Sequence, residues 1–286
     1  MGIQRRITTA LVAGVLAAVS LTACADDQRP LTVGHGDSPE MTTAAAVYAG
    51  ALARTGMDVE TLPHAESQKE LLDGVASGGL GLFPAFTGDL LVQLTPAPTA
   101  ISAEDVIADV NRSLPQQVAI GDPASVSDRW QVLAGQDLKE RSGVETLADC
   151  GRFPADLPIV VVQTPSTSVL DAIAGCHHGP VRSVPTVDEL VTQVRTGRAL
   201  GLATALDTAS VTDLAGVQAL KSDGPPIAQD LVPVFASGRF EKPQLKALSR
   251  VAGELTTADL AQLVREVRDG GSPRAVADQW LATHGV

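Results

Sequence analysis

The sequence predicts an α/β fold with mainly parallel sheets flanked by helices, divided into two lobes. Short apolar runs rich in β-branched residues alternate with segments of helical period along most of the chain. This alternation is typical of strands that are joined through helices. The chain has 286 residues, and because single hydrophobic cores stop growing near ~250–300 residues, two lobes are expected.

The N-terminus has the pattern of a bacterial lipoprotein signal peptide. Arg5 and Arg6 precede an apolar stretch over residues 8–23, which is too short to cross a bilayer unaided. It closes on Leu21-Thr22-Ala23-Cys24, which resembles a lipobox. We therefore expect residues 1–23 to be removed, Cys24 to be acylated, and residues 24–30 to tether the protein to the extracytoplasmic face of the cell membrane. The alternative is an ordinary secretory peptide with a chance cysteine.

The mature chain is acidic and keeps two further cysteines. Loss of the two leader arginines leaves 19 basic residues against 33 acidic ones, a net charge of −14, which is unsuited to binding nucleic acid. Outside the cytosol, the pair Cys150 and Cys176 indicates a disulfide. A metal site that adds His177 and His178 is the alternative, but adjacent histidines diverge and the spacing matches no zinc signature. We expect neither a metal nor a cofactor.

The first part of the mature chain alternates between short strands and helices, and a second set of elements follows. Strands are expected at residues 31–33, 58–60, 80–83 and 117–120, with helices at 41–54, 71–76 and 104–113. A turn over residues 121–124 then leads into a second set, with strands at 130–134, 157–162 and 200–205 and helices at 166–174 and 187–195. After a polar, proline-rich passage, residues 243–284 have helical period, with Thr256 and Ser272 as N-caps.

Three motifs of the mature chain agree in order and spacing with one family of binding proteins. They are Leu31-Thr32-Val33-Gly34 followed by Glu40, Leu82-Phe83-Pro84-Ala85-Phe86-Thr87-Gly88, and Asp128-Arg129-Trp130 followed by Asp137-Leu138-Lys139 and Gly143-Val144. With them the chain resembles the substrate-binding lipoproteins of glycine betaine, carnitine and choline ABC importers. The resemblance implies a type II periplasmic-binding-protein fold, with residues 31–123 and 208–286 in lobe 1 and residues 124–207 in lobe 2.

The same resemblance implies a function and a binding site. Such a protein closes around a small cationic or zwitterionic solute and delivers it to a membrane permease driven by an ATPase, for osmoprotection or nutrition. In the family, a cage of aromatic faces holds a quaternary ammonium group, because a cation without N–H donors is recognised mainly by ring quadrupoles. The resemblance places Phe86, Trp130, Leu206 and approximately Gln229 at the four cage positions. Two of these four are not aromatic, and the whole chain has only eight aromatic residues.

Other departures from the family pattern favour a cationic ligand without a carboxylate. Gly36 stands where betaine binders can carry a lysine for the ligand carboxylate, and Asp89 follows Thr87-Gly88 in place of a hydroxyl residue. Asp89 and Asp207 are candidate counter-charges, together with Asp230, although each could equally be a solvated loop residue. Thr87 offers a hydroxyl to the ligand. Glu40 is a further candidate, although glutamates are common in the first turn of a helix.

Solute binding has two alternatives among the classes of function. Gly36-Asp37-Ser38 is similar to the nucleophile block of GDSL-type lipases and esterases, but Pro39 stands where those enzymes have leucine. That family also needs an Asp-x-x-His near the C-terminus, whereas the nearest pair here, Asp278 and His284, is six residues apart. No Gly-x-Ser-x-Gly motif occurs either, so we expect no enzyme activity. The remaining alternative is a binding-protein fold that serves as a cell-surface receptor or interaction lipoprotein with a degenerate ligand site.

Overall fold

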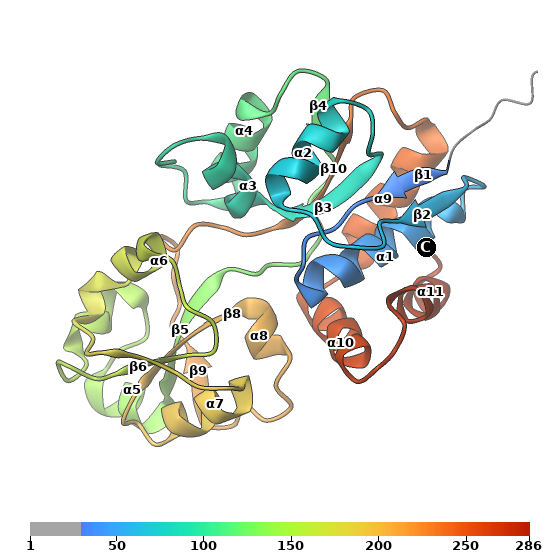
Figure 1. Cartoon of the computed structure of the whole chain (residues 1–286). Helices are drawn as coiled ribbons and strands as arrows, with labels where there is room; N and C mark the ends of the chain where they lie inside the picture. Colours follow the sequence, from blue (N-terminus) through green and yellow to red (C-terminus); the bar gives the residue numbers. More distant parts are fainter. Residues whose placement is uncertain (1–29) are drawn as a thin grey trace, which may run out of the picture.

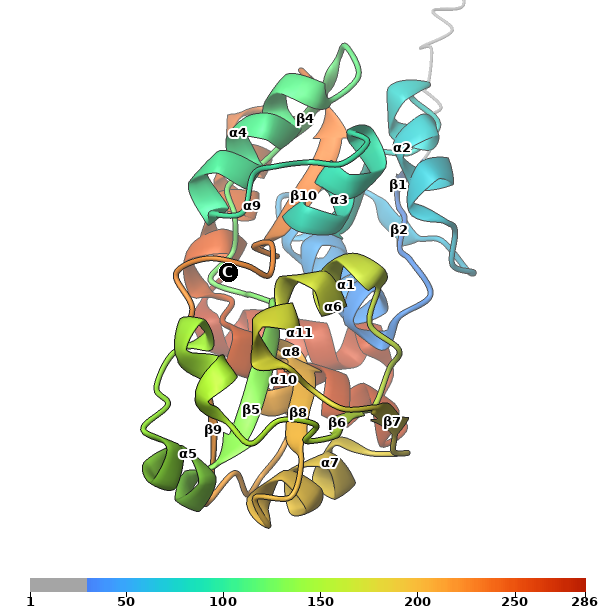
Figure 2. The same ribbon diagram turned by 90° about the vertical axis from the view of Figure 1, so that its left-hand side faces the viewer.

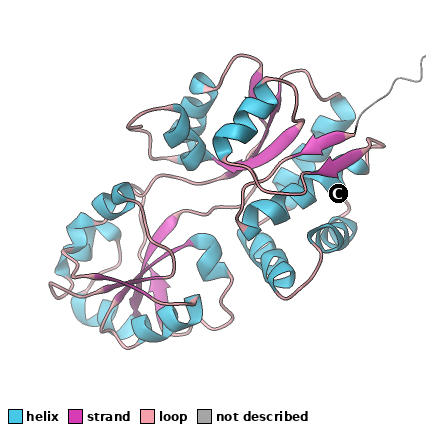
Figure 3. Ribbon diagram, viewed as in Figure 1, coloured by secondary structure: helices cyan, strands magenta, loops and turns pink. Residues whose placement is uncertain are grey.

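The protein has two lobes, each built on its own five-stranded sheet (Figure 1). The computed structural model describes residues 30–286, so the expected signal peptide and Cys24 lie outside the described residues. Helices cover the sheets of both lobes (Figure 3). Among residues 30–286, no helix combines the length and the apolar character that crossing a membrane requires.

Lobe 1 contains the sheet with the order β2-β1-β3-β10-β4. Its strands are β1 (Leu31–Val33), β2 (Val59–Thr61), β3 (Leu82–Phe86), β4 (Val118–Ile120) and β10 (Leu231–Ala236). Its helices are α1 (Pro39–Ala53), α2 (Gln68–Ala76), α3 (Thr87–Leu94), α4 (Ala103–Ser113), α9 (Lys242–Glu254), α10 (Thr257–Arg268) and α11 (Pro273–His284). The expected helical tail is thus confirmed as three helices, and Thr256 caps α10 through a capping box with Asp259.

Lobe 2 contains the sheet with the order β7-β6-β8-β5-β9. Its strands are β5 (Trp130–Gly135), β6 (Ile159–Val161), β7 (Val181–Ser183), β8 (Leu200–Thr204) and β9 (Val217–Ala219). Its helices are α5 (Gln136–Ser142), α6 (Thr167–Ala172), α7 (Val187–Arg195) and α8 (Ala205–Ala209), with the short 3₁₀ helices η1 (Leu147–Arg152) and η2 (Ala174–Cys176). The buried strand β6 is the continuous β-branched run that the sequence shows there.

Both sheets are mixed rather than mainly parallel. In lobe 1, β10 runs antiparallel to its two neighbours β3 and β4, whereas β1 is parallel to β2 and β3. In lobe 2, β5 runs antiparallel to β8 and β9, whereas β6 is parallel to β7 and β8. The antiparallel strand in each sheet is the one that the chain enters directly from the other lobe. The α/β class with two lobes is therefore confirmed, and the mixed direction follows from the two crossings.

The two crossings between the lobes lie side by side and bond to each other. We define the first crossing as residues 121–129 and the second as residues 220–230. Asp128 donates its backbone N–H to the Gln229 carbonyl at 2.9 Å, and the Arg129 guanidinium donates to carbonyls of Gly224 and Pro226. The resemblance implies that lobe 2 ends at residue 207. In the structure the chain leaves lobe 2 after residue 219, because the short strand β9 still pairs with β5.

Helix α8 follows β8 of lobe 2 but packs on α10 of lobe 1, and the two helices lie close together in Figure 2. Leu206 of α8 is buried in the same apolar cluster as residues of α1 and α10. Arg265 of α10 donates to the carbonyls of Ala209 and Ser210 at the end of α8, each at 3.2 Å. The start of α8 therefore lies at the junction of the two lobes.

Candidate functional site between the lobes

A cavity of about 470 Å³ lies between the two lobes, within the ~300–1,000 Å³ typical of small-molecule sites. Its walls are strand β3, the start of α2, the segments that follow β1, β3, β6 and β8, the first crossing and the end of α10. The carboxyl ends of strands are where α/β folds bind ligands. The lining residues are Gly36, Ser38, Pro39, Glu40, Met41, Gln68, Leu71, Phe83, Pro84, Ala85, Phe86, Asp89, Asp128, Val162, Gln163, Thr204, Leu206, Asp207 and Arg268.

On the lobe 1 side, the start of α3 is bonded to the second crossing. Thr87 donates its N–H to the Asp230 carbonyl, and its hydroxyl oxygen accepts from the Asp230 N–H, both at 3.0 Å. The Gln229 amide donates to Asp89 Oδ1 at 2.7 Å and accepts from the Asp89 N–H at 3.1 Å. These bonds hold the Asp89 carboxylate in one orientation at the cavity wall.

Close backbone packing at Gly88 makes these bonds possible. A Cβ atom at this position would lie 2.5 Å from the Ala228 carbonyl oxygen and 2.8 Å from Cδ of Gln229. Only glycine therefore lets the start of α3 approach the second crossing this closely. The Phe-Thr-Gly segment continues directly into helix α3, which begins at Thr87.

On the lobe 2 side, Thr204 caps α8 and organises two aspartates. Its hydroxyl accepts from the Asp207 N–H at 3.2 Å, and its own N–H donates to Asp207 Oδ2 at 3.3 Å. Gln163 also donates to Asp207 Oδ2, at 3.4 Å. Asp128 of the first crossing accepts the Leu206 N–H at Oδ1, at 3.2 Å. Asp128 and Asp207 thus meet at the start of the same short helix.

The charges on the cavity wall are predominantly negative. Four carboxylates line it, from Glu40, Asp89, Asp128 and Asp207, against the single guanidinium of Arg268. Arg268 lies 2.7 Å from Glu40 and neutralises that carboxylate. The remaining three aspartates face the cavity without a basic partner among its lining residues. This excess favours a cationic ligand.

Burial changes the acidity of two of these carboxyl groups. It raises the pKa of Asp128 from 3.8 to about 7, against the opposing hydrogen bonds from Thr204 and Leu206 and with a further rise from the charges of Asp207 and Glu40. Burial also raises the pKa of Asp89, although the Gln229 hydrogen bond lowers it. Asp89 remains open to water in the cavity, so the surrounding atoms crowd its carboxylate without covering it. Carboxyl groups with raised pKa values are typical of functional clefts.

The structure brings together five of the eight residues that the sequence proposes for ligand binding. Glu40, Phe86, Asp89, Leu206 and Asp207 line the cavity.

Three positions differ from the expectation, because their side chains face protein. Thr87 is fully buried and bonds to Asp230, and Gln229 supports Asp89 from behind the wall. Trp130 starts β5, is half-buried and packs against the core of lobe 2. The resemblance places residues by their position along the chain, whereas the direction of each side chain depends on the local strand and helix.

Several polar residues of the wall are not among those that the sequence proposes, including Asp128, Gln163 and Arg268. Asp128 lies within the quoted Asp128-Arg129-Trp130 motif, which was a usable signal, since a carboxylate stands at a crossing next to the proposed site. Gln163 follows the buried strand β6 and could have been found by its place at a strand end. Arg268 had no such signal, because it occupies the polar last turn of an amphipathic helix.

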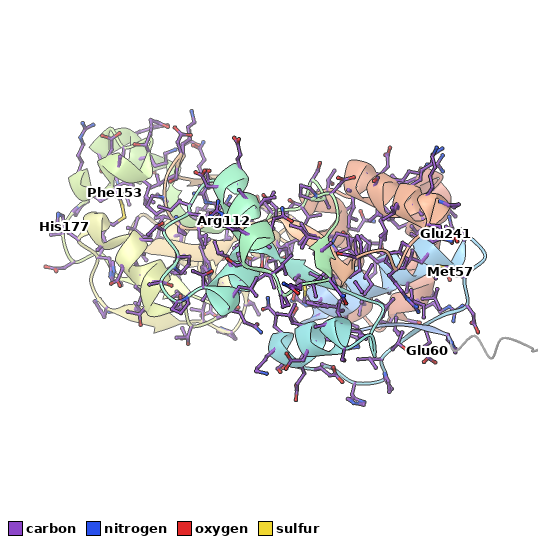
Figure 4. The ribbon with its side chains drawn as sticks, turned by 90° about the horizontal axis from the view of Figure 1, so that it is seen from above. Met57, Glu60, Arg112, Phe153, His177 and Glu241 are labelled. Carbon is purple, nitrogen blue, oxygen red and sulfur yellow. A yellow bond between two sulfur atoms is a disulfide. The ribbon has the colours of Figure 1, made fainter. Side chains whose placement is uncertain are left out.

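The disulfide predicted for Cys150 and Cys176 is present, and it lies away from the cavity. It joins η1 to η2 in lobe 2, with Cα atoms 4.6 Å apart. Figure 4 labels Phe153 and His177, next to these two elements, at the end of lobe 2 that points away from lobe 1. The crosslink therefore stabilises the outer part of lobe 2 and not the cleft.

A comparison with protein families gives one match along nearly the whole described chain. Residues 29–283 match the family described as the substrate binding domain of ABC-type glycine betaine transport systems. Among curated protein sequences, none matches this chain.

Solved structures share the fold at low sequence identity. Ligand-free YehZ from Escherichia coli is 19% identical with a TM-score of 0.70, over 90% of this chain and 99% of that one. A glycine betaine/carnitine/choline ABC transporter structure is 14% identical with a TM-score of 0.70, over 89% and 98%. Lactococcal OpuAC, closed on glycine betaine, is 12% identical with a TM-score of 0.53, over 90% and 96%. These likenesses show the two-lobed binding-protein fold.

Proposed function

The chain belongs to the family of substrate-binding domains of ABC-type glycine betaine transport systems, and we propose that it is the solute-binding lipoprotein of an ABC importer. It binds a cationic amine between its lobes at the extracytoplasmic face of the cell membrane. The family consists of solute-binding proteins and not of enzymes. The observation that carries the proposal is the cavity of about 470 Å³ between the lobes, lined by an excess of carboxylates.

The two crossings supply the motion that such a protein needs. In a hinged binding protein, ligand contacts from both lobes favour the closed form over the open one. Here Asp89 and Phe86 belong to lobe 1, whereas Asp207 and Gln163 belong to the lobe 2 side of the cavity. A ligand that touches both sides therefore draws the lobes together, and the closed form is the one that a permease and its ATPase would accept.

The lipid anchor rests on the sequence. Acylation at Cys24 would hold the protein at the membrane, because a protein that carries two acyl groups is stably anchored there. Metabolic labelling with a radioactive fatty acid tests this step. The wild-type protein should carry the label in the membrane fraction, whereas Cys24→Ser should lose the label and leave the membrane.

The alternative role, a cell-surface receptor or interaction protein, predicts a filled or flat cleft. The open cavity favours the solute-binding role instead. We would titrate the soluble form, starting at residue 25 and freed of co-purified ligand, with choline, glycine betaine, carnitine, proline betaine and a polyamine by calorimetry. Micromolar binding of a cationic member supports the proposal. If no member binds below millimolar concentration, the interaction role leads.

A charge-reversed pair of variants locates the binding. Asp89→Lys places a positive charge on the cavity wall and should abolish binding of a cation. Glu254→Lys makes the same change on the exposed end of α9, outside the cavity lining, and should bind as the wild type does. Equal affinities in the two variants would place the ligand outside the cleft.

A further inference from the structure

We infer that the ligand of the cavity carries N–H donors on its positive nitrogen, as an ammonium or guanidinium group does, in place of a fully methylated nitrogen. The inference rests on the proposed function and narrows the class of solute. It is drawn from the atoms that the cavity wall offers, which are carboxylate oxygens more than aromatic faces.

Two carboxylates offer an oxygen that the protein leaves free. Asp89 Oδ1 accepts from Gln229, and Asp207 Oδ2 accepts from Thr204 and Gln163. Within residues 30–286, no donor reaches Asp89 Oδ2 or Asp207 Oδ1 by hydrogen bond. In each group the bonded oxygen fixes the orientation of the carboxylate while the second oxygen remains for a ligand. Such acceptors are matched by N–H donors, and charge-assisted hydrogen bonds are among the strongest in proteins.

The aromatic surface of the cavity is small. The aromatic residues in its lining are Phe83 and Phe86, both from β3, and they are 0% and 8% exposed. A methylated ammonium is held by ring faces within about 6 Å on several sides. In this cavity the aromatic rings come from β3 alone. Trp130 packs into lobe 2, and the non-aromatic residues Leu206 and Gln229 stand at two further positions of the family's cage. A methylated ligand would also cover the free carboxylate oxygens without bonding to them, which is costly.

The placement of the charges argues against two other kinds of ligand. A metal ion needs ligands gathered at one point, and within the described residues no three His, Cys, Asp or Glu side chains are gathered to hold one. A ligand carboxylate would need a cation, and Arg268 of the wall is already bonded to Glu40 at 2.7 Å. An organic cation without a carboxylate fits carboxylates that are spread over both sides of the cavity.

Matched pairs of probes test the inference directly. Ethanolamine and choline differ in the methyl groups on nitrogen, as do 1,5-diaminopentane and its bis-trimethylammonium analogue. Calorimetric titration of the mature protein should give tighter binding of the N–H member in every pair that binds, by roughly ten- to hundredfold. That ratio corresponds to one charge-assisted hydrogen bond.

Variants then assign the preference to the two carboxylates. In Asp89→Asn and Asp207→Asn, the preference for the N–H member should fall to a few-fold in at least one variant, whereas Glu254→Gln should keep it. Equal or tighter binding of the methylated members, or a preference that both cavity variants retain, would overturn the inference while the proposed function stands. If neither these probes nor the betaines bind, the inference and the proposed function both fail.

Discussion

Replacing Asp128 by asparagine tests whether burial raises the pKa of this carboxyl group at the first crossing. Burial raises the pKa of this group from 3.8 to about 7. The folded protein therefore holds a proton between pH ~4 and ~7 that the unfolded chain has already lost. Over this pH range the free energy of unfolding falls as the pH rises. The stabilisation of the folded state by the proton on Asp128 is lost once the pH passes about 7.

The size of the effect follows from the shift. About three pKa units at ~1.4 kcal/mol each give roughly 4 kcal/mol between the fully protonated and fully ionised protein, as an upper value, because water in the cavity screens the carboxylate. Of this, about 2.5 kcal/mol falls between pH 5 and pH 8. Asparagine keeps an oxygen for the Leu206 N–H but has no proton to lose, so this part of the pH dependence should vanish in Asp128→Asn.

Guanidinium denaturation of ligand-free protein at pH 5 and pH 8 measures the difference. Other carboxyl groups with raised pKa values, such as Asp89 and Asp230, contribute with the same sign, so the comparison is between wild type and variant. We expect the wild type to lose about 1 to 2.5 kcal/mol more than Asp128→Asn over this range. A loss that is the same in both proteins would refute the role given to burial of Asp128.

Three further variants test the packing around the cleft and the lobes. Gly88→Ala should push the second crossing away, because its Cβ would lie 2.5 Å from the Ala228 carbonyl oxygen. We expect a loss of about 1–3 kcal/mol of stability and weaker ligand binding. An unchanged midpoint of denaturation would contradict this. Trp130→Ala should cost about 2 kcal/mol of stability but change affinity by less than threefold, and complete loss of binding would return Trp130 to the site. Replacing Cys150 and Cys176 by serine opens a loop with a separation of 26 residues and should cost about 3 kcal/mol by loop entropy, seen as a lower thermal midpoint without a change in affinity.

Much of the fold could be predicted because its local signals agree. Helices α1, α4, α7 and α10 carry a Ser or Thr N-cap and acidic residues in the first turn, and the buried strands of both sheets read as apolar runs. Strand β10 was missed, because Pro233 counts against a central strand. In the sheet, Pro233 lies opposite Pro84 of β3, and a strand-to-strand pairing of this kind cannot be read from either segment alone.

The candidate site was harder to predict than the fold. The acidic character of the cavity wall follows from Asp89 and Asp207, which the sequence indicates. The supporting contacts do not, since Gln229 reaches Asp89 across 140 positions of the chain and Arg268 reaches Glu40 across 228. These contacts depend on how the last third of the chain returns to lobe 1, which no local pattern determines.

A crystal structure of the mature protein grown with its tightest cationic ligand would show whether the cavity between the lobes is the binding site. We expect the ligand between the two lobes, with its charged nitrogen within hydrogen-bond distance of Asp89 or Asp207 and with the lobes closed around it. A ligand bound at another surface, with the cavity between the lobes empty, would contradict this expectation.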